Sequence, residues 1–167
     1  MHHSIMDLDV RAYKAGDSAH LLNIDLKGSE IPFTITDWQL IQRDFPHWTI
    51  LLAIIEGKPC GFALFSFDTD KGVARVHKLA ALSYAHSMGV IGMLLNSVQY
   101  KGLVAGVNIV EVVVPSHECL GKDDPYDRSY MLNNLGFRCV RVTEGVFNAY
   151  GDPVEAYCFS RPIDYGN

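Results

Sequence analysis

The stretch that decides the fold spans residues 77–95 and reads HKLAALSYAHSMGVIGMLL. Its first six residues continue a strand-like run that begins at Val73. Beyond Gly89, apolar residues recur at helical spacing, so a helix is expected to start at or just after this glycine. A loop that leaves a strand and enters a helix at a glycine exposes unpaired backbone N–H groups at the positive end of the helix dipole. The stretch therefore predicts an anion site with phosphate as the expected ligand, unless the glycine only makes the turn.

Working outward from this stretch, the sequence predicts alternating strands and helices along its whole length. Residues 107–114 are almost continuously apolar and β-branched, which is typical of a central strand covered on both faces. Together with the preceding strand and helix, this run predicts a right-handed crossover. The other expected elements are a strand at 9–13, a helix capped by Asp17 or Ser18, a second helix capped by Thr36 or Asp37 and ending near Asp44, a hairpin of strands 48–55 and 60–67, a helix at 126–135 capped by Asp124, and closing strands at 137–143 and 154–160.

The order of these elements, β-α-α-β-β-β-α-β-α-β-β, together with four short motifs, resembles the GNAT superfamily of acyl-CoA-dependent N-acetyltransferases. Residues 77–82 are similar to the family's fourth strand, and residues 86–91 (HSMGVI) to its Q/R-x-x-G-x-G/A loop. Residues 135–137 (LGF) and 156–159 (AYCF) resemble the segment after the family's fourth helix and its closing strand. The resemblance covers most of the chain. It implies an α/β (α+β) fold with a mixed, mostly antiparallel central sheet and helices on both faces.

The resemblance also implies that acetyl-CoA is the co-substrate. In such a site the backbone groups of Leu79, Ala80 and Ala81 would pair with the pantetheine arm. The pyrophosphate would be held by amides of the loop, namely those of Ser87, Met88, Gly89, Val90 and Ile91, with His86 as a further donor to phosphate. The loop is degenerate, because His86 stands where the family has Gln or Arg and Ile91 where it has Gly or Ala. A branched side chain at position 91 is a candidate for crowding the phosphate.

Transfer of an acetyl group to an amine needs a base for the ammonium proton and an acid for the leaving thiolate. His77 is the expected base, because a neutral imidazole titrates near pH 6.5 and relatives that acetylate arylalkylamines carry histidine at this strand position. The alternative is a structural role, in which His77 is a strand residue whose ring is hydrogen-bonded to a neighbouring residue. The family's usual tyrosine acid falls on Leu132 here. Tyr130 is the remaining candidate acid, although it lies about 200° round the helix from that position, and a surface or packing role is the alternative.

Composition limits the other classes of function. The 167 residues carry a net charge of −5, with 49% apolar and 20% charged residues, which predicts one globular domain over residues 1–167. The charge has the wrong sign for general attraction to nucleic acid. The most apolar run, residues 48–55, is far shorter than the roughly 20 residues of a membrane span, and no basic-then-apolar leader opens the chain, so a cytoplasmic protein is expected.

The chain has four cysteines, Cys60, Cys119, Cys139 and Cys158. They form no CxxC pair and are expected to be reduced thiols, and no metal site is predicted.

Two functions follow from these observations. The first is an N-acetyltransferase that moves an acetyl group from acetyl-CoA to a primary amine of a small molecule or protein. The alternative is a catalytically weak or inactive GNAT-fold protein, a regulator or phage-type host-targeting factor, that acts by binding a partner protein. The altered loop and the leucine at position 132 favour this alternative. A homodimer is left open.

Overall fold

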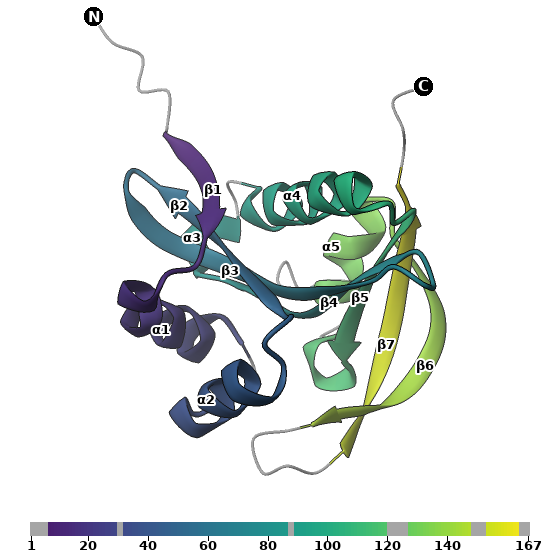
Figure 1. Cartoon of the computed structure of the whole chain (residues 1–167), viewed down its shortest axis with the longest axis horizontal. Helices are drawn as coiled ribbons and strands as arrows, with labels where there is room; N and C mark the ends of the chain where they lie inside the picture. Colours follow the sequence, from purple (N-terminus) through teal and green to yellow (C-terminus); the bar gives the residue numbers. More distant parts are fainter. Residues whose placement is uncertain (1–6, 30–31, 87–88, 120–126, 148–152, 164–167) are drawn as a thin grey trace, which may run out of the picture.

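A computed structural model describes residues 7–29, 32–86, 89–119, 127–147 and 153–163 (Figure 1). Within these residues the strands form one seven-stranded sheet in the order β1-β2-β3-β4-β5-β7-β6. The strands are β1 (Leu8–Ala12), β2 (Thr49–Ile55), β3 (Lys58–Asp68), β4 (Val73–Ala81), β5 (Ile109–Pro115), β6 (Arg138–Phe147) and β7 (Pro153–Pro162). The helices are α1 (Ser18–Gly28), α2 (Ile35–Asp44), α3 (Ser83–His86), α4 (Val90–Ala105) and α5 (Arg128–Asn134), with short 3₁₀ turns η1 (Ala15–Asp17) and η2 (Ser116–Glu118).

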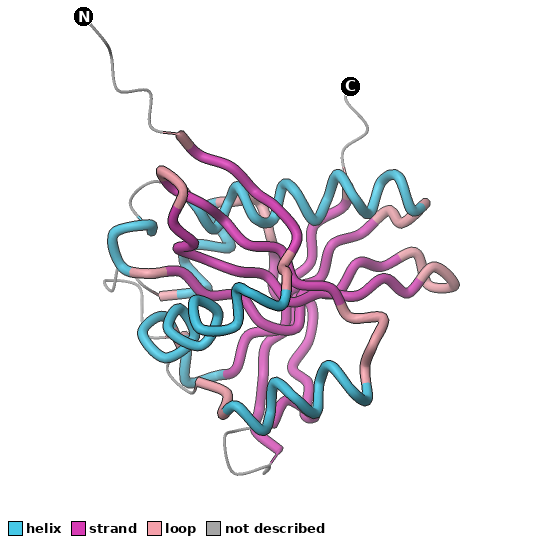
Figure 2. Tube along the Cα trace, turned by 60° about the vertical axis from the view of Figure 1, so that its left-hand side comes forward, coloured by secondary structure: helices cyan, strands magenta, loops and turns pink. Residues whose placement is uncertain are grey.

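The sheet is mostly antiparallel and is covered by helices on both faces. Strands β4 and β5 pair in parallel, and the other neighbouring strands pair antiparallel. Helices α1 and α2 lie on one face, and α4 and α5 lie on the other (Figures 1 and 2). This arrangement confirms the fold class predicted from the sequence. Among the described residues, no helix is long and apolar enough to cross a membrane.

Each covered face has its own hydrophobic core. The larger core lies between the sheet and helices α4 and α5, where Leu94 and Leu95 are fully buried. The smaller core lies between the sheet and helices α1 and α2, where Leu21 and Trp38 are buried. Burial of each such side chain contributes about 1.5–3 kcal/mol to folding. The sheet is therefore held from both sides, which fixes the positions of its central strands.

Helix α4 begins where the sequence predicts. Gly89 is its N-cap and adopts φ +72°, a left-handed conformation that glycine reaches without strain. The helix buries Val90, Ile91 and three further apolar residues against the sheet, and it ends at Gly106 with φ +87°. The two glycines thus set both ends of the helix that carries the predicted anion loop.

The N-caps of helices α2 and α5 differ from the sequence prediction. Helix α2 is capped by Thr34, two residues before the predicted cap, because the Thr34 hydroxyl accepts a hydrogen bond from the Asp37 N–H and the Asp37 carboxylate accepts one from the Thr34 N–H. This reciprocal capping box satisfies two helix-end donors at once. Helix α5 begins at Arg128 with Asp127 as its cap. The predicted cap Asp124 and the predicted start at residue 126 lie outside the described residues.

Candidate functional site

A β-bulge in strand β4 places His77. The register between β3 and β4 pairs Leu64 with Lys78 and Phe65 with Val76, so His77 is an extra residue on β4. A bulge of this kind re-aims neighbouring side chains and bends the strand. His77 and Lys78 consequently both contact groups on the face covered by α1 and α2, where strict alternation would have separated them.

Strands β4 and β5 separate beside this bulge. Their parallel pairing runs from Val73 opposite Ile109 to Val76 opposite Val112, and no further pairing between them occurs within the described residues. Beyond Val76, strand β4 stays paired with β3, and β5 stays paired with β7. Each of the two central strands therefore stays paired with its other neighbour, while the hydrogen bonds between β4 and β5 themselves end at this point. Leu79, Ala80 and Ala81, the residues predicted to bind pantetheine, lie on the separated part of β4.

His77 is held on two sides. Its Nε2 lies 2.7 Å from the Ser66 Oγ, and its ring stacks on the Trp48 indole with 3.7 Å between centroids and 9° between planes. Burial, with further contributions from Arg75 and His47, lowers the pKa of His77 to about 4. The sequence analysis expected titration near pH 6.5, so the fold shifts this group downward. The imidazole is neutral at physiological pH and can accept a proton, with Nε2 oriented by Ser66.

This lowered pKa predicts a pH-dependent contribution to stability. The unfolded chain binds a proton at His77 near pH 6.5, and the folded protein does so only near pH 4, so the contribution is fully present above about pH 6.5 and is lost as the pH falls toward 4. The difference between the two pKa values corresponds to roughly 3 kcal/mol of folding free energy. We expect the stability of His77→Gln, measured by urea unfolding, to fall less than that of wild type over this range. Parallel pH profiles for the two proteins would contradict the shift.

Lys78 joins the same face to helix α1 through a buried ion pair. Its Nζ lies 3.0 Å from Asp25 Oδ1, and the two side chains are 9% and 0% exposed. The ammonium also sits 3.5 Å from the centroid of the Phe33 ring. Burial lowers the pKa of Lys78, while the Asp25 carboxylate opposes that change. This pair fixes the strand that carries His77 against the helical layer.

The predicted anion loop is described by the structure only from Gly89 onward and at His86. Gly89 is exposed, and a Cβ built on it would meet no atom within 4 Å. The side chains of Val90 and Ile91 are 0% and 4% exposed and belong to the core, so the branched side chain at position 91 turns away from the loop surface. Among the other predicted phosphate ligands, Ser87 and Met88 lie outside the described residues. His86 ends helix α3.

The predicted acid does not take the position of the family's tyrosine. Leu132 is fully buried in the core beneath α5, and Tyr130 is 48% exposed. These positions agree with the offset of about 200° expected for two residues on a helix. Tyr130 therefore lies on the outer side of α5. Among the described residues, the side chain of His77 contacts Ser66 and Trp48, and no contact with Tyr130 is found.

A charged cluster that spans strands β4, β5, β7 and β6 was missed by the sequence analysis. Glu111 of β5 is 8% exposed, and its carboxylate accepts hydrogen bonds from Arg141 and Arg75 at 2.9 and 3.4 Å and from the Cys158 thiol at 3.3 Å. Burial would raise the pKa of Glu111, but the bonds from Arg141 and Cys158 outweigh burial and lower it. One signal was present in the sequence: a single acid within an apolar, β-branched run. Arg75 lies two residues before His77 on β4 and also contributes to the lowered pKa of His77.

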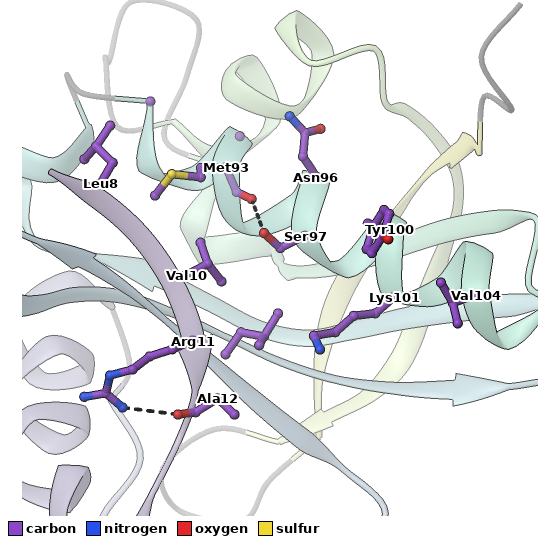
Figure 3. Close-up of a pocket in the computed structure, with 13 residues that line it drawn as sticks. Leu8, Val10, Arg11, Ala12, Met93, Asn96, Ser97, Tyr100, Lys101 and Val104 are labelled. Atoms are coloured by element: carbon purple, nitrogen blue, oxygen red, sulfur yellow. Dashed lines mark hydrogen bonds between the residues drawn. The ribbon is translucent and has the colours of Figure 1, made fainter. Parts of the chain in front are cut away.

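The sequence also gave no sign of a groove of about 940 Å³ between β1 and α4 (Figure 3). Its walls include Leu8 and Val10 from the strand and Met93 and Tyr100 from the helix. Of the residues predicted to bind the co-substrate, Gly89 alone is among the described residues that line this groove. The groove therefore runs from the loop along the β1 side of α4, away from the separated part of β4 and β5.

Comparisons with known proteins identify the fold. No family model matches the sequence, and no curated protein matches it. Solved structures do match. The ribosomal-protein-S18-alanine N-acetyltransferase from Escherichia coli is 14% identical with a TM-score of 0.71, covering 96% of this chain and 97% of that one. Nourseothricin acetyltransferase is 14% identical with a TM-score of 0.68, covering 94% and 99%. The yncA protein from Salmonella typhimurium, solved with its cofactor acetyl-CoA, is 15% identical with a TM-score of 0.63, covering 96% of each chain.

These likenesses confirm the fold predicted from the motifs: the chain has the GNAT acetyltransferase fold. They extend over nearly the full length of this chain and of each neighbour. At such low identity they establish the fold, and the chemistry has to be argued from this chain's own residues.

Proposed function

We propose that this protein is an acetyl-CoA-dependent N-acetyltransferase acting on a primary amine. The observation that carries the proposal is the separation of β4 and β5 next to His77, at the end of the sheet that leads to the Gly89 loop. An extended thioester needs such a gap to bring its reactive carbonyl beside a base. The fold similarity to a protein solved with acetyl-CoA supports the same reading.

The loop fits the phosphate groups of this co-substrate. The first turn of α4 has N–H groups without partners inside the helix, and it begins at an exposed glycine with open space over its Cα. The amides from Gly89 to Ile91 would hold pyrophosphate, and the backbone from Leu79 to Ala81 would pair with the pantetheine arm. Bound acetyl-CoA supplies the activated acetyl thioester.

In the proposed reaction the amine nitrogen attacks the thioester carbonyl carbon, and the C–S bond breaks. The nitrogen loses one proton to Nδ1 of His77, in the tautomer whose Nε2–H donates to the Ser66 Oγ, and the thiolate that leaves is protonated by water. The products are an N-acetylated amine and CoA. His77 fits the role of base because its imidazole is neutral at physiological pH and the Ser66 contact at Nε2 orients the ring while leaving Nδ1 to accept the proton.

Replacing Gly89 with aspartate tests the co-substrate site. Wild type is expected to melt at a higher temperature with acetyl-CoA, because a ligand at one hundred times its dissociation constant adds about 2.7 kcal/mol. Gly89→Asp is expected to abolish that shift, since its carboxylate repels phosphate at the helix start. Scanning fluorimetry with and without acetyl-CoA measures both.

Gly106→Asp is the matched control for this variant. Gly106 has a similar left-handed φ, sits at the other end of the same helix, and also has open space over its Cα. The control therefore shares the backbone strain of Gly89→Asp and should keep the acetyl-CoA shift. A shift that survives in folded Gly89→Asp would rule out the loop as the phosphate site.

Turnover decides between this enzyme and a GNAT-fold binding protein. The buried Leu132 favours the binding protein, because it leaves the usual acid position without a proton donor. By their names, the neighbours act on a ribosomal-protein alanine and on nourseothricin, so the test panel contains peptide N-termini and small aminated compounds. Thiol release from acetyl-CoA with an amine of this panel supports the enzyme. Binding of acetyl-CoA without turnover on any amine would favour the alternative.

A further inference from the structure

Arg128 is a buried charge at the start of helix α5. It is 4% exposed, although arginine usually keeps its guanidinium in water. Residues four apart share one face of a helix, and Leu132, four residues further on, is fully buried in the core beneath α5. The Arg128 side chain is therefore directed into the layer between α5 and the sheet. This layer borders the chain that follows β5, since the negative charge of Glu118 in that segment acts on Arg128.

Two of the three guanidinium nitrogens of Arg128 lack an acceptor within the part of the chain that the structure describes. Its Nε and Nη1 are buried and have no hydrogen-bond partner among the residues that the structure describes. Two other arginines are paired: Arg141 donates to Glu111, and Arg161 donates to the Leu135 carbonyl and to Gln99. Burial lowers the pKa of Arg128, yet a guanidinium cannot lose its proton in a protein. A charged group of this kind is normally satisfied by an acceptor, an ordered water or an ion.

We propose that Arg128 is the receptor for an oxyanion group of a ligand that binds beneath the start of α5. A planar guanidinium matches the geometry of carboxylate and phosphate better than any other side chain does. The negative charge of Glu118 already acts on Arg128, so the local charge balance favours a singly charged carboxylate over a phosphate dianion. This site involves neither the Gly89 loop nor His77, and the inference does not rest on the proposed transferase activity.

The first test compares wild type with Arg128→Met in thermal melts, with sodium acetate replacing sodium chloride at constant ionic strength. The melting temperature of wild type should rise with acetate concentration and then reach a plateau. The melting temperature of Arg128→Met should not rise with acetate. Without acetate, Arg128→Met should melt at or above the wild-type temperature, because the variant removes a buried charge that has no partner. Arg161→Met is the matched control: it breaks satisfied hydrogen bonds, so it should melt lower and keep the acetate response.

A second measurement keeps the proposal testable even if Arg128→Met fails to fold. The Nε–H signal of Arg128 in a ¹H–¹⁵N spectrum of wild type, assigned by its loss in Arg128→Lys, should shift on addition of acetate. Phosphate is added as a separate arm in the Gly89→Asp background, so that the loop cannot account for its effect. A larger response to acetate than to phosphate supports a carboxylate ligand, and the reverse supports a phosphate ligand at the same site. An Nε–H signal that responds to neither anion would overturn the proposal, as would equal acetate responses in wild type and Arg128→Met.

Discussion

Replacing His77 with alanine is expected to slow thiol release from acetyl-CoA in the presence of a competent amine by about 10²-fold to 10⁴-fold, the range that a positioned general base supplies. The fold restrains His77 through the Trp48 stack and the Ser66 contact. The pKa of about 4 lies well below the working pH, which reduces the driving force for proton transfer. We therefore expect the effect to fall in the lower part of the range.

The pH profile gives this prediction a second readout. An ordinary histidine would switch off as the pH falls through about 6.5. Because the pKa of His77 is lowered to about 4, the wild-type rate should show no loss that traces to His77 between about pH 8 and pH 6. His20→Ala is a suitable control, since His20 is an exposed residue of helix α1 and its loss should leave the rate within about twofold. Undiminished turnover in His77→Ala would exclude His77 as the base.

Replacing Asp25 with alanine should cost about 3–5 kcal/mol of folding stability, because the change leaves a buried ammonium without its counter-ion. Besides Lys78, the Asp25 carboxylate accepts hydrogen bonds from the Phe33 N–H at 2.8 Å and the Trp38 indole N–H at 3.2 Å. It also accepts one from the Ser29 hydroxyl at 2.7 Å. One side chain thus ties α1, the segment before α2, α2 itself and β4 together. Urea unfolding measures the loss.

The chain offers a matched surface pair as the control. Arg43 and Asp44 lie 2.8 Å apart, a distance similar to that of the buried pair, but their side chains are 70% and 49% exposed. Solvent screens such a pair, so Asp44→Ala should leave the free energy of unfolding nearly unchanged. The buried position, rather than the ion-pair distance, decides the size of the effect. Equal losses in the two variants would show that burial does not isolate the Lys78 ammonium from water.

Much of the fold was predictable because it depends on local rules. The glycine at position 89 marks the start of α4 because few other residues adopt its backbone conformation. The two-residue turn at Glu56 and Gly57 joins β2 to β3 for the same reason. Periodicity of apolar residues located α4 and β5, and the short motifs in their order were enough to predict the GNAT fold, which the solved neighbours confirm. Cap positions were less certain, because several adjacent residues in α2 can accept the same hydrogen bonds.

The chemistry of the site was decided only in the tertiary structure. The sequence pointed to His77 as a candidate base. The register shift that makes it a bulge residue, however, depends on how β3 pairs with β4. Its lowered pKa depends on burial and on charges at positions 47 and 75. The pairing of Lys78 with Asp25, the cluster round Glu111 and the burial of Arg128 likewise join or enclose groups that are distant along the chain. A residue's type and its neighbours in sequence set its backbone preference. Its electrostatic energy is set by the solvent it loses and the charges it meets, and both of these exist only once the chain has folded.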